Sequence, residues 1–299
     1  MVVACGGAVR VAHGAAGAAR AAPCYRERMT PTMAVVGFGN MGSALATGAV
    51  RHQAADPRQM IVIESDAAAR ERAALLGCRV SANAHDARGA ACVVLAVKPQ
   101  VMREVSGAIG ELSSPALVIS IMGGITLASI SEALGPMARC VRAMPNLCVQ
   151  AGQGMTAYAC GPRCRDDDRD FVTRFFGAVG DAVEVQETML DAATAVSGSG
   201  PAYAFLLAEA WIDAAMSLGF DRATASRMVR RTMLGAATMM AQGGSPADLR
   251  AMVTSPGGTT SAALAVLDAR GFRSALHDAL RAARDRGREL SAHAAGVAK

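Results

Sequence analysis

Val36-Gly37-Phe38-Gly39-Asn40-Met41-Gly42 sets three glycines in the spacing G-x-G-x-x-G, after the apolar run 33–36 and before a helical pattern over 41–51. In a strand–turn–helix unit with this spacing, the first glycine makes the turn and the second lets a pyrophosphate approach the backbone. The third allows the helix to pack closely on the strand. We therefore expect a dinucleotide-binding β-α-β unit here.

Apolar runs and helical patterns continue to alternate after this unit. The expected strands are 33–36, 60–63, 91–97 and 116–120, and the expected helices are 41–51, 67–76, 101–112 and 126–134. Continuous apolar strands separated by helices are typical of a parallel sheet covered on both faces. Further strands are expected at 138–143, 154–159 and 182–185, with a helix from about 163 to 176. The predicted fold class of 31–186 is therefore α/β, a Rossmann-type domain.

Strand patterns stop at Glu187, and long Ala/Leu/Met-rich helical stretches follow. They are expected at 201–218, 222–242, 246–253, 259–269 and 272–291. Their apolar residues cover too much of each helix for a simple surface helix. Large side chains would then be exposed in a lone subunit, namely Trp211, Met216, Met228, Met233, Met239 and Met240. We therefore predict that 187–299 form an all-helical substrate and dimerisation domain.

The charge and hydropathy of the chain restrict its partners. Of the net charge of +5, residues 1–30 contribute +3 through four arginines and one glutamate, which leaves about +2 for the rest. That balance does not favour nucleic acid as a partner. No apolar run reaches the roughly 18 to 20 residues of a membrane span. We expect a soluble, cytoplasmic protein with residues 1–30 as a disordered extension, although an organelle transit peptide or a start at Met29 or Met33 stays open.

The positions of the cysteines and lysines say less about function than the glycine motif does. The eight cysteines (5, 24, 78, 92, 140, 148, 160 and 164) form no C-x-x-C pair, so we interpret them mainly as reduced, buried thiols and expect no metal. Cys160-Gly-Pro-Arg-Cys164 keeps a redox or metal-binding pair open as an alternative. Lys98 and Lys299 are the two lysines beside 28 arginines. Lys98 stands between a buried strand and Pro99, where it is either a chance residue or part of the cofactor's lining.

A second glycine motif, Thr254-Ser255-Pro256-Gly257-Gly258-Thr259-Thr260, precedes the helical stretch 259–269. Backbone N–H groups at a helix start have no partner within the helix and lie at its positive end. Glycines let a ligand approach the backbone, and hydroxyls add directed hydrogen bonds. The heptad therefore predicts a site for a small carboxylate.

The end of the second strand, Glu64-Ser65-Asp66, bears on the choice between NAD and NADP. An acidic side chain there accepts a hydrogen bond from the ribose 2′-OH and repels a 2′-phosphate, which favours NAD. Ser65 together with Arg70 or Arg72 would instead favour a phosphate. Both cofactors stay open.

Several motifs occur together in a fixed order. They are Gly-Asn-Met-Gly at 39–42, Ala-Val-Lys-Pro at 96–99, Ile-Thr at 125–126, Met-Pro-Asn at 144–146, Ser-Gly-Ser-Gly-Pro-Ala-Tyr at 197–203 and Ser-Pro-Gly-Gly-Thr-Thr at 255–260. Over about 33–290 the chain thus resembles the pyrroline-5-carboxylate reductases, which catalyse the last step of proline synthesis. Leu147-Cys148 replaces the usual Thr-Pro, and Met122-Gly123-Gly124 stands where two small residues and a glycine are usual.

The resemblance implies roles for individual residues. The cofactor-binding residues would be Gly37, Phe38, Gly39, Asn40, Met41 and Gly42 at the pyrophosphate, Ser65 and Asn83 toward the adenosine half, Ala96, Val97, Lys98 and Pro99 along the dinucleotide, and Gly123 and Asn146 near the nicotinamide. Ser255 and the backbone of Gly257, Gly258 and Thr259 would hold the carboxylate. Thr260 would hydrogen-bond the ring nitrogen and is the predicted catalytic residue. The family assembles through the helical domain as dimers, often built into decamers.

The chemistry of this reaction agrees with such a site. A pyrroline iminium is already an electrophile, so hydride transfer needs orientation and a donor near nitrogen rather than a strong base. Related imine reductases and hydroxyacid dehydrogenases are enzyme alternatives. The latter place a lysine on the long interdomain helix, and 199–219 contain none. A non-catalytic dinucleotide-binding regulator is the third alternative, but such a protein would be expected to lose the hydroxyls and glycines of 254–260.

Overall fold

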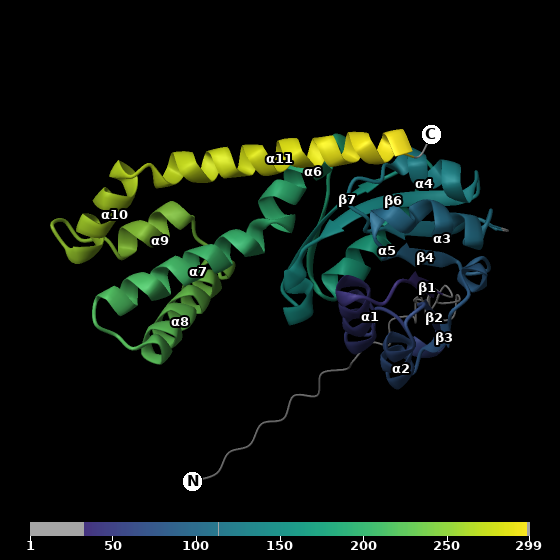
Figure 1. Ribbon diagram of the computed structural model, residues 1–299, viewed down its shortest axis with the longest axis horizontal. Helices are drawn as coiled ribbons and strands as arrows, with labels where there is room; N and C mark the ends of the chain where they lie inside the picture. The colour runs from purple at the N-terminus through teal and green to yellow at the C-terminus, as the bar shows by residue number, and fades with distance from the viewer. Residues whose placement is uncertain (1–32, 113, 298–299) are drawn as a thin grey trace, which may run out of the picture. The chain divides into compact units, whose positions relative to one another are not determined.

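The computed structural model describes residues 33–112 and 114–297, with side chains described as far as residue 292. The predicted disordered extension 1–30 lies outside the described residues. Within the described part of the chain, the fold consists of an eight-stranded sheet followed by a series of helices (Figure 1).

The sheet has the strand order β3-β2-β1-β4-β5-β6-β7-β8. The strands are β1 Met33–Val36, β2 Met60–Ile63, β3 Arg79–Ser81, β4 Cys92–Leu95, β5 Ala116–Ser120, β6 Ala138–Pro145, β7 Gly154–Cys160 and β8 Gly180–Glu184. The strands β1 to β6 run parallel. Strand β7 is antiparallel to β6, and β8 is parallel to β7. The chain therefore adds two reversed strands to a parallel Rossmann-type sheet.

Helices cover both faces of this sheet, as the continuous apolar strands predict. Helices α1 (Asn40–Arg51), α2 (Ala67–Leu75) and α5 (Asp166–Gly177) bury residues in one apolar cluster. Helices α3 (Met102–Ile109) and α4 (Leu127–Leu134) bury theirs in a second cluster. Neighbouring residues of one strand belong to different clusters, Val35 to the first and Val36 to the second. This alternation follows from the period of two along a strand.

Two expectations differ from the structure in detail. Strand β3 was not expected from the sequence, because it has three residues and two of them, Arg79 and Val80, are exposed at the edge of the sheet. The helix expected at 101–112 covers Met102–Ile109. Gly110 ends it with a φ of 72°, a conformation that residues other than glycine rarely adopt.

The second half of the described chain is helical, in agreement with the prediction. It contains α6 Leu190–Ala193, the π-helix η7 Thr194–Gly198, α7 Gly200–Ser217, α8 Arg222–Ala241, α9 Pro246–Met252, α10 Thr259–Ala269 and α11 Phe272–Val297. Short 3-10 helices connect other elements, namely η2 Pro57–Gln59, η3 Ala84–Ala87, η4 Pro99–Val101, η5 Leu147–Ala151 and η6 Glu187–Met189. Helix α7 packs on α8, α10 packs on α11, and α11 contacts α6 and η7.

The helices α7 to α10 have almost no core of their own. From Gly200 to Ala292, Ala225 and Val229 are the only buried hydrophobic residues among those described. Large apolar side chains are exposed instead, including Phe205 at 58%, Leu206 at 65% and Trp211 at 44%. Met228, Met239 and Met240 are exposed as expected, whereas Met216 and Met233 are partly buried. An apolar surface of this kind is typical of a protein–protein interface.

Candidate active site

The three glycines of the first loop have different surroundings, which correspond to different roles. Gly37 has a φ of 97°, and a Cβ there would lie 2.6 Å from the Ala96 carbonyl oxygen. A Cβ on Gly42 would lie 2.2 Å from the Gly37 carbonyl oxygen. A Cβ on Gly39 would meet nothing within 4 Å. Gly37 and Gly42 therefore permit close packing, and Gly39 leaves open space for a ligand.

The N-terminus of α1 is free to bind an anion. Gly39 is its N-cap residue and has no side chain, and the first helical hydrogen bond is donated by the Ser43 N–H to the Gly39 carbonyl at 2.9 Å. The N–H groups of Asn40, Met41 and Gly42 thus lack helical partners at the positive end of the helix dipole. The loop fits a dinucleotide pyrophosphate.

Phe38 has a different role from its neighbours. Its ring is buried, and its N–H donates to Glu64 Oε2 at 2.7 Å. Burial opposes ionisation of Glu64, but hydrogen bonds from the N–H groups of Phe38 and Asp66 outweigh it and lower the pKa of this carboxyl group. Glu64 is therefore an ionised group that holds the glycine loop against the end of β2.

The segment after β2 also positions Ser65 and Arg70. Ser65 is exposed, and its hydroxyl donates to Glu64 Oε1 at 3.1 Å. Arg70 Nη1 donates to the carbonyl oxygens of Glu64 and Ser65, each at 2.7 Å. The guanidinium group is thereby held beside the Ser65 backbone. Arg72 is exposed further along α2.

The loop after β4 carries Ala96, Val97, Lys98 and Pro99. The Ala96 N–H donates to the Val36 carbonyl at 2.8 Å, which joins this loop to the glycine loop at the carboxyl edge of the sheet. Lys98 is exposed, and in the described chain its side chain makes no hydrogen bond or ion pair. Asn83, after β3, is also exposed, and its Oδ1 accepts the His85 N–H at 3.1 Å.

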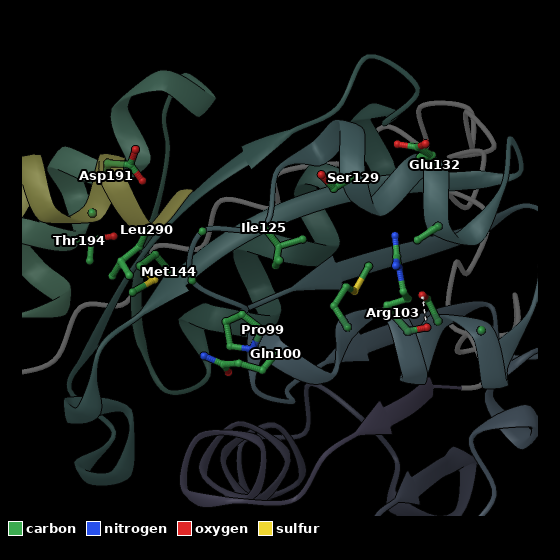
Figure 2. A pocket seen from close by; sticks show the side chains of 17 residues that line it. Pro99, Gln100, Arg103, Ile125, Ser129, Glu132, Met144, Asp191, Thr194 and Leu290 are labelled. Atoms are coloured by element: carbon green, nitrogen blue, oxygen red, sulfur yellow. Dashed lines mark hydrogen bonds between the residues drawn. The ribbon is translucent and has the colours of Figure 1, made fainter. Parts of the chain in front are cut away.

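A cavity of about 690 Å³ opens beside these loops (Figure 2). Pro99 and Gly123 line it, together with residues of α3, α4, η7 and α11. Most of its lining is apolar, with Asp191 and Thr194 near one end and Arg103 and Glu132 near the other. Its volume falls within the range of small-molecule sites, roughly 300 to 1,000 Å³. The cavity provides room for a ligand next to Gly123, one of the two predicted nicotinamide residues.

Asn146 is buried and fully engaged in hydrogen bonds. Its Oδ1 accepts the N–H groups of Cys148 and Met155, each at 3.2 Å. Its Nδ2 donates to the Ser197 carbonyl at 3.3 Å and to the Ser197 hydroxyl at 3.2 Å. Asn146 thus joins the end of β6 to the π-helix η7, a type of helical irregularity that is frequent at functional sites.

The distal motif forms the start of α10, as its pattern predicts. Gly257 has a φ of 70°, Gly258 is the N-cap residue, and no side chain caps the helix. A Cβ on Gly258 would lie 2.4 Å from Ser255 Oγ, so the serine side chain lies against this glycine. Thr260 is partly buried, whereas Ser255 and Thr259 are exposed. The N–H groups of Thr259, Thr260 and Ser261 are therefore available to an anion.

The structure brings the predicted cofactor residues together and leaves the predicted substrate residues 255–260 apart from them. The glycine loop, the loop after β4 and Gly123 lie along the carboxyl edge of the sheet. Within the described residues, no hydrogen bond or ion pair links 255–260 to residues 33–186. Figure 1 draws α10 at the opposite side of the molecule from α1 and β1, so in a single chain the predicted substrate residues are not assembled with the predicted cofactor residues.

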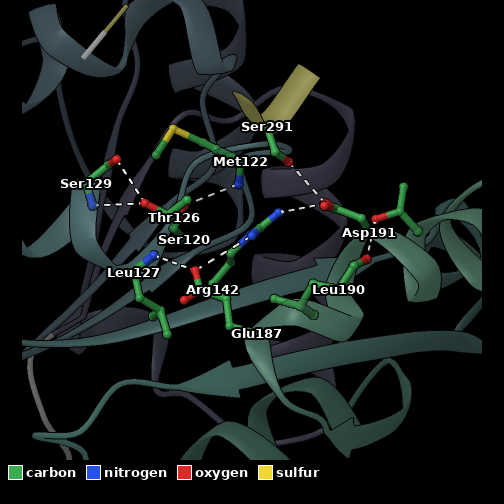
Figure 3. Close-up of polar contacts among 11 residues, drawn as sticks. Ser120, Met122, Thr126, Leu127, Ser129, Arg142, Glu187, Leu190, Asp191 and Ser291 are labelled. Carbon is green, nitrogen blue, oxygen red and sulfur yellow. Dashed lines mark hydrogen bonds and ion pairs between the residues drawn. The ribbon is translucent and has the colours of Figure 1, made fainter. Parts of the chain in front are cut away.

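A buried arginine that was not singled out as a site residue connects the sheet to the helical part (Figure 3). Arg142 on β6 lies 3.2 Å from Asp191 Oδ1 and 3.7 Å from Glu187 Oε1. Glu187 accepts the Leu127 N–H at 2.7 Å, and Ser291 donates to Asp191 at 3.1 Å. The only signal in the sequence was an arginine inside an apolar strand pattern. This network holds α4, α6 and α11 around β6.

The fold and the glycine loop define the class: the chain is an NAD(P)-dependent oxidoreductase. The family model described as "NADP oxidoreductase coenzyme F420-dependent" matches residues 32–124, which contain the glycine loop and the loop after β4. A second family model, "Pyrroline-5-carboxylate reductase dimerisation", matches residues 187–290. The chain belongs to the pyrroline-5-carboxylate reductase family.

Curated relatives and solved structures support this assignment over most of the chain. The reductase of Synechocystis sp. is 38% identical over 88% of this chain and 99% of the relative. That of Pseudomonas aeruginosa is 40% identical over 88% and 97%. A pyrroline-5-carboxylate reductase structure from Coxiella burnetii has a TM-score of 0.82 at 33% identity, over 88% of this chain and 99% of the other. A pyrroline carboxylate reductase structure from Plasmodium falciparum, with NADP bound, has a TM-score of 0.78 at 28% identity, over 88% of this chain and 98% of the other.

Proposed function

We propose that this chain reduces 1-pyrroline-5-carboxylate to L-proline by hydride transfer from NADPH or NADH, the last step of proline biosynthesis. The observation that carries the proposal is the similarity to reductases of that name, at 38 to 40% identity over 88% of the chain. Two uncapped, glycine-rich helix starts, at α1 and α10, support it, because the reaction needs one anionic cofactor and one anionic substrate.

The start of α10 supplies substrate recognition in this proposal. The Ser255 hydroxyl and the backbone of Gly257, Gly258 and Thr259, of which the Thr259 N–H is free in the described chain, would bind the carboxylate. The Thr260 hydroxyl would hydrogen-bond the ring nitrogen and stabilise the change in charge there as the C=N bond is reduced. A hydroxyl suffices for this role, since a protonated imine is already electrophilic.

The carboxyl edge of the sheet supplies the cofactor site. The open space at Gly39 and the free N–H groups of Asn40, Met41 and Gly42 suit the pyrophosphate. Ala96, Val97, Lys98 and Pro99 would line the dinucleotide toward Gly123 and the cavity, and Asn83 would lie at the adenosine end. When bound, the dihydronicotinamide supplies the hydride that adds to the imine carbon. Asn146 would position the nicotinamide end of the cofactor by fixing the turn that follows β6.

We infer that NADPH is preferred over NADH. The carboxylate of Glu64, which would select NAD, already accepts the Phe38 and Asp66 N–H groups and the Ser65 hydroxyl. Arg70 lies beside Ser65, so its guanidinium group supplies a cation for a 2′-phosphate. Arg70→Ala is expected to raise KM for NADPH at least ten-fold more than KM for NADH. Equal changes in the two KM values would contradict the preference.

The proposal includes a homo-oligomer whose active site is shared between subunits. Residues 31–186 would form the cofactor domain and 187–299 the substrate and dimerisation domain. Helices α7 to α10 expose apolar side chains and lack a core, so a partner would cover them. Because the start of α10 makes no hydrogen bond or ion pair with its own cofactor loops in the described chain, we infer that it completes the site of a partner subunit. Both dimers and decamers are compatible with this arrangement.

None of the helices in the described part of the chain has the length and apolarity needed to cross a membrane. The six described cysteines are free thiols, which suits a reducing compartment, and we place the reaction in the cytoplasm.

A direct assay tests the function and separates it from its alternatives. The purified protein is incubated with 1-pyrroline-5-carboxylate and either NADPH or NADH, and cofactor oxidation and L-proline are both measured. Proline formed in proportion to oxidised cofactor supports the proposal. Turnover of other cyclic imines or of hydroxyacids, with none of the pyrroline, would favour a related reductase or dehydrogenase. The absence of any turnover would favour a non-catalytic regulator.

A further inference from the structure

One end of the cavity carries a carboxylate that has no role in the proposed reaction. Asp191 and Thr194 line this end (Figure 2). Arg142 and Ser291 both donate to Asp191 Oδ1, at 3.2 and 3.1 Å, and so hold the side chain in place (Figure 3). In the described part of the chain, Asp191 Oδ2 accepts no hydrogen bond. The carboxylate at the cavity therefore keeps one acceptor oxygen for a ligand.

The charge and the hydrogen-bonding groups at this end of the cavity select the kind of ligand. Arg142 pairs with two carboxylates, Asp191 at 3.2 Å and Glu187 at 3.7 Å, so one negative charge is left without a cation. The Thr194 hydroxyl donates to the Leu190 carbonyl at 2.8 Å, so its oxygen can only accept from a ligand. Both side chains thus present acceptors. They suit a ligand group with N–H donors and repel the substrate's carboxylate.

The loop that contains Gly123, one of the two residues predicted near the nicotinamide, lies close to Asp191. A Cβ on Gly124 would lie 3.4 Å from the Ser291 Cα and 3.4 Å from the Leu290 carbonyl oxygen, so this loop packs directly on α11. Ser291 in turn donates to Asp191. The Gly123 loop and the Asp191 carboxylate therefore contact the same turn of α11.

Thr194 lies near the other residue predicted at the nicotinamide, Asn146. A Cβ on Gly198 would lie 3.3 Å from Thr194 Cγ2 and 3.5 Å from Met144 Cε, so Thr194 and the end of β6 both lie beside this glycine. Asn146 closely follows Met144 in the chain and donates to Ser197, the neighbour of Gly198. The polar end of the cavity thus adjoins both predicted nicotinamide residues.

We propose that Asp191 recognises the carboxamide group of the dihydronicotinamide, with Oδ2 accepting a hydrogen bond from the carboxamide NH2 group and the Thr194 oxygen as a second acceptor. The inference rests on the proposed function, which supplies the cofactor. The carboxamide is the part of the nicotinamide that carries N–H donors, and its NH2 group has one N–H bond for each of the two side chains. Fixing the carboxamide fixes the ring, and with it the carbon C4 from which hydride leaves. Asp191 is therefore a specificity-determining residue for the cofactor.

The test measures the binding of three compounds to the full chain by isothermal titration calorimetry, with no substrate present. They are NADPH, its 3-acetylpyridine analogue, in which a methyl group replaces the NH2 group, and 2′-phospho-ADP-ribose, which lacks the nicotinamide. For the native protein we expect a Kd for the analogue about ten-fold or more above that for NADPH, because the methyl group cannot donate and leaves Asp191 Oδ2 unpaired. This comparison needs no variant, so it holds even where a substitution at Asp191 weakens folding.

Asp191→Asn is the main variant, because it keeps the size of the side chain. Arg142 and Ser291 both donate to Oδ1, so they orient the amide with its oxygen toward them and its NH2 group toward the ligand. A donor then replaces the acceptor and pairs with the carbonyl group of either compound. We expect the ratio of the two Kd values to fall below about three-fold, while the Kd of 2′-phospho-ADP-ribose changes by less than about two-fold. Ser291→Ala is the matched control and should keep the native ratio, since it leaves Oδ2 in place.

Three results would overturn the proposal. The first is native protein that binds the analogue and NADPH with similar Kd values. The second is an Asp191→Asn variant that binds all three compounds more weakly by the same factor, as a purely structural role predicts. The third is an Asp191→Asn variant that keeps the native ratio. Because the titrations contain no 1-pyrroline-5-carboxylate, a protein that discriminates between NADPH and the analogue but forms no proline would contradict the proposed function alone.

Discussion

Gly39 and Gly42 occupy one short loop, yet their surroundings impose different constraints. A side chain on Gly39 would extend into open space, whereas one on Gly42 would collide with the Gly37 carbonyl. The G-x-G-x-x-G spacing predicted both roles, because turn and packing geometry repeat wherever this loop occurs. It did not predict that Glu64 would accept the Phe38 N–H, since this bond depends on the direction of one side chain across a turn.

These surroundings predict opposite effects for two substitutions. Gly39→Asp is expected to leave thermal stability unchanged or slightly higher, because aspartate is a good N-cap residue, while its charge repels the pyrophosphate and abolishes cofactor binding. Gly42→Ala is expected to lower the free energy of unfolding by about 1 to 3 kcal/mol through overpacking. Thermal unfolding and fluorescence titration with NADPH measure both quantities. A Gly39→Asp variant that binds NADPH normally would exclude the pyrophosphate from this loop.

Thr260 is the residue to which we assign the hydrogen bond with the ring nitrogen. Thr260→Val is expected to lower kcat/KM by roughly ten-fold or more, because one such hydrogen bond contributes about 1 to 3 kcal/mol. Thr259→Val is the matched control, since Thr259 is proposed to act through its backbone N–H, and it should change kcat/KM by less than three-fold. Steady-state kinetics with 1-pyrroline-5-carboxylate provide the comparison. Normal kinetics for Thr260→Val would remove the assigned role.

At the scale of elements, Arg142 joins strand β6 to the segments that carry Glu187 and Asp191. Helix boundaries such as those of α10 were predictable from local glycines and hydroxyls. The ion pairs of Arg142 were not predictable from the sequence, because Arg142 and Asp191 are distant in it. They meet only after the sheet and helices have packed. The division of the chain at 186 and 187 stays a prediction.

Removing Arg142 would leave two carboxylates facing a vacated, largely buried space. Arg142→Ala is expected to lower the free energy of unfolding by about 3 kcal/mol, since loss of one partner leaves buried charge without compensation. Arg273→Ala is the control, because the Arg273–Asp268 pair is exposed and should contribute less than about 1 kcal/mol. Urea unfolding measures both. Equal effects of the two substitutions would mean that the Arg142 network does not hold the elements together.

A second ion pair links β6 to α5 and predicts a dependence of stability on pH. Burial opposes ionisation of Asp168, but hydrogen bonds from Arg139, at 2.8 and 3.0 Å, and from the Arg165 N–H lower the pKa of Asp168. The folded-state pKa is lower than the unfolded one, so the stabilisation is present above about pH 4 and is lost as pH falls through the folded value. Asp168→Asn is expected to flatten the stability profile below about pH 4. An unchanged profile in urea unfolding would exclude this contribution.

At the scale of the whole molecule, the exposed apolar helices and the separated halves of the site lead to one inference, a shared active site. Apolar residues around most of each helix predicted the exposed surface, but not which residues of the site would lie apart in one chain. Leu206→Glu, on the exposed face of α7, is expected to shift the assembly toward monomers. Leu75→Glu, at a position on α2 that is even more exposed, is the control and should not change the assembly. Light scattering after size exclusion measures the masses, and an active wild-type monomer would contradict the inference.

Subunit mixing tests the shared site more directly. Gly39→Asp and Thr260→Val subunits are expected to be defective alone, one in the cofactor loop and the other at the start of α10. If the two parts of a site come from different chains, a mixed dimer contains one intact site. Co-expressed subunits should then be more active than the average of the two parent proteins. Activity equal to that average would show that each site is built from a single chain.

The central claim is that hydride passes from the dihydronicotinamide to the imine carbon of 1-pyrroline-5-carboxylate. NADPH carrying deuterium at both C4 positions is incubated with the protein and this substrate, and the proline is analysed by NMR and mass spectrometry. The account predicts L-proline with one deuterium, located at C5, in a yield equal to the NADPH consumed. Unlabelled proline, or NADPH oxidation without proline, would contradict it.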